Sequence, residues 1–184
     1  MKNLQEQIRR IHEIMGLNNT IKGFHISKTP ISKIDNRFLV DNHLSDKPEG
    51  FWFTYDPNKW KEFYYGDSAE NYFQYEITID PTNIITLDTI DKINEFNRIY
   101  ESDKYMYDHE NDLNESVWGV IWTSPNWFNV KKDYYGIEFP NYEQLKSQID
   151  FNDVKNQWLT FIDVNSGCIW NEKSVIDFKQ IQFS

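Results

Sequence analysis

The stretch "GFHISKTP", residues 23–30, places a histidine between two large apolar residues and ends at a proline. An apolar run this short, closed by proline, predicts a buried strand over residues 23–27. A histidine in such a strand is usually a core residue with a backbone partner, and less often a group that binds a ligand. The role of His25 therefore depends on which residues the fold brings beside it.

Strands and helices alternate along the rest of the chain. Helical spacing of apolar residues predicts one helix before the first strand and others between the strands, over residues 3–17, 56–66, 90–102 and the first half of 126–139. Apolar or alternating patterns predict further strands over residues 50–55, 72–80, 83–89, 158–163, 167–171 and 175–183, the last of them at a sheet edge. We expect one mixed α+β domain over residues 21–184, preceded by an amphipathic N-terminal helix and a hinge over residues 1–20 that dock on the domain or on a partner.

Composition excludes several classes of function. The net charge of −10 makes non-specific binding to nucleic acid unfavourable, because phosphate neutralisation needs clustered lysine and arginine. A single cysteine and four scattered histidines give neither a disulfide framework nor the spacing of a zinc site. No apolar run reaches about 18 residues, and charges occupy the place of a signal peptide's apolar core, so we expect a cytoplasmic protein without a membrane span.

Three separated segments form an ordered pattern. "FHIS" (24–27) comes first, and "GFWFTYDPNKWKEFYY" (50–65) joins an aromatic strand to a helix with further aromatics. "DYYGIEF" (133–139) and "FIDVNSGCIWNEKSV" (161–175) complete it. This order resembles the ADP-ribosyltransferases of the histidine–tyrosine–glutamate class, above all small divergent phage members such as the anti-CRISPR ADP-ribosyltransferases. The resemblance covers about residues 21–176, and it implies a split β-sheet sandwich with flanking helices.

The resemblance also implies that NAD is bound as a substrate, and it gives each matching residue a role. His25 would bind a ribose hydroxyl on the adenosine side, the backbone of Ile26 would hold the carboxamide, and Ser27 would support the ribose. Trp52 stands where the family has its tyrosine and would stack on the nicotinamide. Phe63 matches the second aromatic, in the helix that follows.

Simpler structural roles compete with these assignments. His25 can be a hydrogen-bonded strand histidine, and Trp52 can be a core residue, since alternate strand residues face the core. Arg37 is a candidate for the pyrophosphate, because a guanidinium fork suits phosphate oxygens, but a surface charge explains it equally.

The carboxylate that the reaction needs is the point at which the sequence departs from the family. Ser166 occupies the usual glutamate position. Asp163, three residues earlier, is the first candidate for the acid that stabilises the positive ribose, and its alternative role is to cap the turn "DVNSG". Glu138 is the second candidate, with a solvated strand residue as its alternative. A degenerate, non-catalytic site is the third possibility.

The resemblance thus implies an NAD-dependent ADP-ribosyltransferase that modifies a macromolecule and releases nicotinamide. The first candidate for the macromolecule is a host protein in the host cytoplasm. Two alternatives stay open. The chain is either a non-enzymatic module, virion-associated or inhibitory, that docks through its N-terminal helix, or an NAD glycohydrolase with water as the acceptor.

Overall fold

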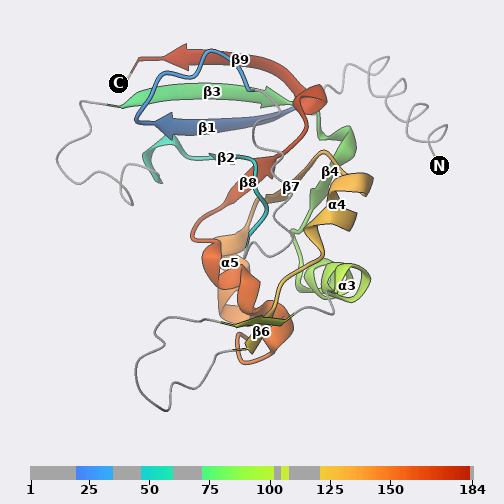
Figure 1. Cartoon of the computed structure of the whole chain (residues 1–184). Helices are drawn as coiled ribbons and strands as arrows, with labels where there is room; N and C mark the ends of the chain where they lie inside the picture. The colour runs from blue at the N-terminus through green and yellow to red at the C-terminus, as the bar shows by residue number, and fades with distance from the viewer. Residues whose placement is uncertain (1–19, 35–46, 60–71, 102–104, 108–120, 183–184) are drawn as a thin grey trace, which may run out of the picture.

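The computed structural model describes residues 20–34, 47–59, 72–101, 105–107 and 121–182, and Figure 1 shows the arrangement of their strands and helices. The predicted α+β class is confirmed. The strands are β1 (Ile21–Ser27), β2 (Phe51–Thr54), β3 (Phe73–Ile79), β4 (Ile84–Thr86), β5 (Tyr105–Tyr107), β6 (Ile121–Thr123), β7 (Gly136–Phe139), β8 (Ser166–Ile169) and β9 (Val175–Ile181). The α-helices are α3 (Ile90–Tyr100), α4 (Trp127–Asp133) and α5 (Tyr142–Leu145), and the 3₁₀ helices are η3 (Pro81–Asn83), η4 (Lys146–Gln148), η5 (Val154–Phe161) and η6 (Glu172–Ser174).

Seven of these strands form one mixed sheet in the order β4-β7-β8-β2-β1-β3-β9. The pairs are antiparallel except β4–β7, which is parallel. Strands β5 and β6 pair separately with each other. In Figure 1, β9, β3 and β1 lie together as one group, while β8, β7 and β4 run at a steep angle to them.

The contact between these two groups of strands is narrow. Strands β1 and β2 share a single register pair, Phe24 with Thr54, whereas β1 and β3 pair along seven residues. Phe53 fills the space beside this contact and is fully buried. A Cβ atom would lie 2.3 Å from its ring at Gly23 of β1 and 2.4 Å from it at Gly167 of β8. Two glycines are therefore required where the Phe53 ring crosses the neighbouring strands.

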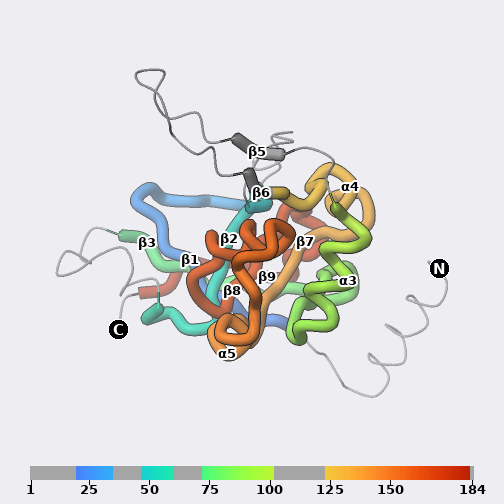
Figure 2. Tube along the Cα trace, turned by 90° about the horizontal axis from the view of Figure 1, so that it is seen from below, coloured from blue at the N-terminus to red at the C-terminus, as the bar shows by residue number. Residues whose placement is uncertain are grey.

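Apolar side chains form a core on each face of the sheet. The larger core joins the sheet to the helices and includes Phe96 of α3, Trp127 of α4, Tyr142 of α5 and Trp158 of η5. Figures 1 and 2 both place α3 and α4 side by side. The smaller core lies on the opposite face and consists of residues from the strands and from the segment after β1, namely Ile34, Phe51, Phe53, Ile77, Ile79, Ile84 and Ile169. Alternation along β2 separates the two, because Phe51 and Phe53 enter the smaller core while Trp52 packs against the larger one.

Most predicted strands are confirmed, but the strand over residues 158–163 is wrong. These residues belong mainly to the 3₁₀ helix η5, whose N-cap Asp153 accepts a hydrogen bond from the amide of Lys155. Trp158 and Leu159 are both buried, which a strand with one buried face does not allow. The helix predicted in the first half of 126–139 is confirmed as α4, and Gly136 opens strand β7.

Several predictions lie outside the described residues. They concern the N-terminal helix within residues 1–20, most of the helix expected over 56–66, and the segment that carries Arg37. The helix over 90–102 is confirmed as α3, which begins at the N-cap Thr89.

Candidate functional site

His25 lies at the point where β1 and β2 part. Its Nδ1 atom is 2.7 Å from the backbone carbonyl oxygen of Trp52. Because a carbonyl only accepts hydrogen bonds, Nδ1 carries the proton, and in the neutral ring Nε2 is the acceptor nitrogen. The imidazole also packs against Phe51, with 4.2 Å between ring centroids. The structure therefore brings the predicted residues His25 and Trp52 into direct contact, through the Trp52 backbone.

Burial lowers the pKa of His25 below its usual value of 6.5, and the hydrogen bond to the Trp52 carbonyl offsets part of this change. The unfolded chain then binds a proton at a higher pH than the folded protein does. Stability is accordingly unaffected above the unfolded pKa and falls as the pH drops through about 6.5 toward the folded pKa.

We expect the free energy of unfolding of the wild type to fall more steeply between about pH 7.5 and pH 5.5 than that of His25→Asn, which removes the titrating ring. Urea unfolding at several pH values measures the difference. Equal slopes for the two proteins would contradict the assignment of a buried, neutral His25.

The other predicted residues of this region lie on β1 and β2. Ile26 is buried and Ser27 ends β1, where its hydroxyl accepts a hydrogen bond from the amide of Thr29. The Trp52 side chain turns to the other face of the sheet, where its Nε1 donates to the Pro48 carbonyl at 3.1 Å. The ammonium group of Lys47 lies 5.2 Å from the centre of the Trp52 rings. The indole is thus held in place by the segment that leads into β2.

Glu138 is a buried carboxylate held by two hydroxyl groups. The residue is 8% exposed. The Tyr55 hydroxyl donates to Oε2, and Thr86 Oγ1 donates to Oε1 at 2.7 Å. Burial raises the pKa of Tyr55, and the negative charge of Glu138 raises it further, so Tyr55 stays protonated as the donor. The expectation of a solvated strand residue at Glu138 is therefore wrong.

Register places Glu138 on the same face of the sheet as His25. Glu138 is opposite Gly167, and Gly167 is opposite Phe53. Phe53 in turn lies across from His25, one residue from the pair of Phe24 with Thr54. These residues form one row across β7, β8, β2 and β1. Phe53 separates the histidine from the carboxylate within that row.

Asp163 lies in a different place. It is exposed, in the loop between η5 and β8. Burial raises the pKa of Tyr142, and the charge of Asp163 raises it further, which puts the aspartate on the side of the larger core. His25 packs on the smaller core instead. The structure therefore does not bring Asp163 and His25 together.

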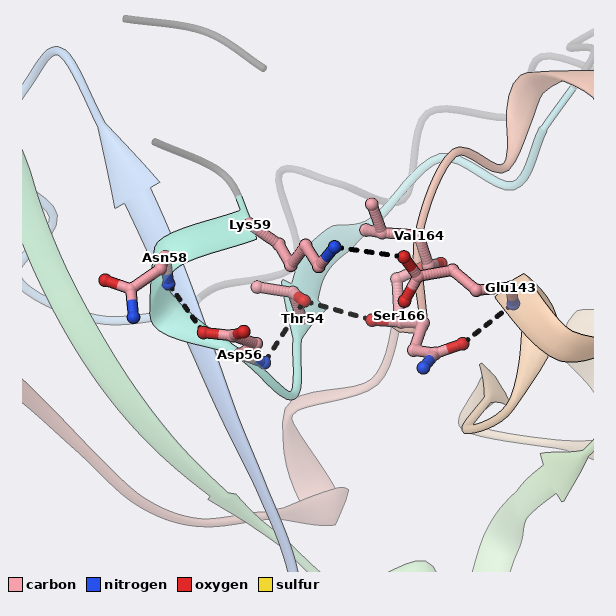
Figure 3. A network of polar contacts seen from close by, with 8 residues as sticks. Thr54, Asp56, Asn58, Lys59, Glu143, Val164 and Ser166 are labelled. Atoms are coloured by element: carbon pink, nitrogen blue, oxygen red, sulfur yellow. Dashed lines mark hydrogen bonds and ion pairs between the residues drawn. The ribbon is translucent and has the colours of Figure 1, made fainter. Parts of the chain in front are cut away.

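A polar network surrounds the end of β2, as Figure 3 shows. Thr54 Oγ1 donates to the Asn165 carbonyl at 3.0 Å, and the Asn165 side chain accepts from the amide of Glu143 at 2.9 Å. The Glu143 carboxylate pairs with Lys59 at 3.2 Å. Ser166, at the position of the family's glutamate, is buried and donates to the Val164 carbonyl at 2.9 Å. These contacts fix β2 against the start of β8.

Arg37, the candidate for the pyrophosphate, and Phe63, the match to the family's second aromatic residue, lie outside the described residues. Sequence reasoning missed Tyr55 and Thr86. The alternation of Phe51, Phe53 and Tyr55 was the available signal, because it predicts a buried phenol that needs a polar partner. Nothing in the sequence near Thr86 indicates its contact with Glu138.

Within the parts of the chain that the structure describes, no group of histidine, cysteine and acidic residues could hold a metal ion. The helices of those same parts are all too short or too polar to cross a bilayer. Comparisons with protein-family models, with curated proteins and with solved structures find no match.

Proposed function

We propose that this chain is an NAD-dependent ADP-ribosyltransferase with an ADP-ribosyltransferase-like split sheet, and that NAD binds where β1 and β2 part. The observation that carries the proposal is the contact between the His25 ring and the Trp52 carbonyl. It joins the first two elements of the sequence pattern, which are 27 residues apart in the chain. The narrow connection between β1 and β2 supports the split.

The polar groups of β1 beside β2 are of the kind that bind a nucleotide. In a neutral His25 with its proton on Nδ1, Nε2 is an acceptor nitrogen, the type of atom to which a ribose hydroxyl donates. Beyond Phe24 and Thr54, the described parts of β1 and β2 form no further register pair. Ile26 therefore has no register partner on β2. The carboxamide of nicotinamide can form hydrogen bonds with backbone N–H and C=O groups.

The acid in this proposal is Glu138, which lies on the same face of the sheet as His25. Cleavage breaks the bond between the ribose C1′ and the nicotinamide nitrogen, and the bonding electrons leave with nicotinamide. A bond from the acceptor nucleophile to C1′ forms, and the nucleophile loses its proton. A carboxylate stabilises the positive charge that develops on the ribose. Each oxygen of Glu138 has two lone pairs and accepts one hydrogen bond from a hydroxyl, so each has capacity for another.

The acceptor in this proposal is a protein, in line with the sequence resemblance. The net charge of −10 disfavours an acceptor coated with phosphates. NAD itself carries few charges, and a small site can hold it despite the negative charge of the whole chain.

A second candidate function is an NAD-binding module without transfer activity. The observation that favours it is that the carboxylate of Glu138 is buried under two hydroxyls, while Ser166 stands at the usual position of the acid. Binding of NAD without release of nicotinamide would identify this module. Release without a labelled macromolecule would identify a glycohydrolase.

Calorimetric titration with NAD tests the proposal with two variants of His25. His25→Asn retains a donor near the position of Nδ1 for the Trp52 carbonyl and lacks Nε2. We expect it to keep the fold and to bind NAD about tenfold more weakly, the effect of about one hydrogen bond. His25→Gln places its amide near the position of Nε2, so we expect it to lose stability but to keep more of the affinity. Equal NAD affinity in wild type and His25→Asn, or no binding by the wild type, would contradict the proposal.

A further inference from the structure

Strand β9 forms one margin of the sheet. It pairs with β3 along one side, and in the described portion of the chain no strand pairs with its other side. Figure 1 shows it at the outer end of the group formed with β3 and β1. Ile176, which lies where β9 shifts its register against β3, is 58% exposed. A long edge strand with an exposed apolar residue offers a row of backbone donors and acceptors to another strand.

The sequence of β9 is complementary to itself in charge. The central residues read Asp177, Phe178 and Lys179. When a second copy of β9 lies antiparallel with Phe178 opposite Phe178, each Asp177 lies opposite the Lys179 of the other copy. Opposite charges in directly facing positions of an antiparallel pair stabilise it. Two-fold symmetry forms this contact twice.

We propose that β9 is a homodimer interface, through which two copies of this chain join their sheets edge to edge, with Asp177 of each copy facing Lys179 of the other. The two-fold axis passes between the two Phe178 residues. The β9 edge of each copy is then paired with that of the other, so this contact joins two copies and no more. The proposal does not depend on the NAD site proposed between β1 and β2.

The charges also select this register. A shift of two residues in one direction brings Asp177 opposite Asp177, and the same shift in the other direction brings Lys179 opposite Lys179. Like charges in facing positions destabilise a pair of strands. Charged residues at a sheet edge normally prevent pairing with unrelated strands, and here they leave one favourable partner.

Contacts within each copy extend the charge pattern across the interface. Lys179 Nζ lies 2.8 Å from Oε1 of Glu76 on β3, and the two residues are directly opposite each other. Asp177 is opposite Thr78. In the dimer, Lys179 therefore lies between Glu76 of its own chain and Asp177 of the other, and the signs alternate along the row.

Sedimentation equilibrium over a concentration series tests this interface at about 0.15 M salt, where the Debye length of about 8 Å screens the repulsion between two acidic molecules. We expect the wild type to reach twice the monomer mass as its concentration rises. Asp177→Lys should weaken the dimer at least about tenfold, because two attractive pairs become repulsive. Glu172→Lys makes the same charge change in η6, outside β9, and should dimerise like the wild type.

The triple variant Asp177→Lys, Lys179→Asp, Glu76→Lys exchanges the charges of the whole row, including the Glu76 partner of Lys179, and restores complementary pairs, so it should regain the dimer that the single variant loses. Far-UV circular dichroism verifies that each variant is folded. A wild type that remains monomeric at all concentrations would overturn the proposal. A dimer that Asp177→Lys leaves unchanged, or that the exchange fails to restore, would overturn it as well.

Discussion

Glu138→Gln is expected to slow the release of nicotinamide from NAD by about 10²–10³-fold, the effect of losing one electrostatic group that stabilises a charged transition state. Glutamine has nearly the same shape: its carbonyl oxygen can accept from one of the two hydroxyls of Tyr55 and Thr86, and its NH2 group can donate to the oxygen of the other. It lacks the negative charge that the developing ribose cation needs. The affinity for NAD should change much less than the rate. In the ground state the positive charge of NAD lies on the nicotinamide ring, and it develops on the ribose only in the transition state.

Asp163→Asn is the matched control, since it makes the same change of carboxylate to amide in the loop before β8. We expect it to release nicotinamide at a rate close to that of the wild type. A chromatographic assay of free nicotinamide measures all three proteins. If Asp163→Asn lost the activity and Glu138→Gln kept it, the acid would be Asp163 and the assignment of Glu138 would be wrong.

Phe53→Ala is expected to lower the free energy of unfolding by about 3–5 kcal/mol, the usual cost of removing a buried aromatic ring. The ring is fully buried and lies against the backbone of Gly23 and Gly167. Neither glycine has a side chain that could move into the space, so the cavity cannot be filled from the neighbouring strands. Urea unfolding of wild type and variant measures the loss.

Phe128→Ala is the control for this change, because it removes the same ring from a position that is 41% exposed on α4. Its contact with the ammonium group of Lys132 makes the expected loss about 0.5–1 kcal/mol. A loss for Phe53→Ala as small as that for Phe128→Ala would contradict the role of Phe53 as the residue that packs the two groups of strands together.

Much of the fold could be predicted because the local patterns are strong. Residues 72–80 alternate along β3, and the apolar spacing after Thr89 gives α3. The strand predicted over residues 158–163 is wrong because a short apolar run does not distinguish a strand from a helix. In the folded chain Trp158 packs against Phe96 of α3 and Trp127 of α4. The order of the seven strands depends on contacts between distant segments, and no local pattern contains it.

The candidate site could be predicted only in part. The sequence indicated His25 and Trp52 as residues of one site, and the fold joins them through a backbone carbonyl that no sequence pattern specifies. Tyr55 and Thr86 reach Glu138 across 83 and 52 residues of the chain. Such contacts follow from strand order and register, since a shift of one residue in β7 would turn Glu138 to the opposite face of the sheet.

The binding of NAD where β1 and β2 part is tested most directly by an NMR titration of the ¹⁵N-labelled chain with NAD. We expect the largest shift changes at the backbone amides of Phe24–Ser27 in β1 and Phe51–Thr54 in β2, and only small changes at those of β9. Shift changes confined to other elements, or none at millimolar NAD, would contradict the proposed site.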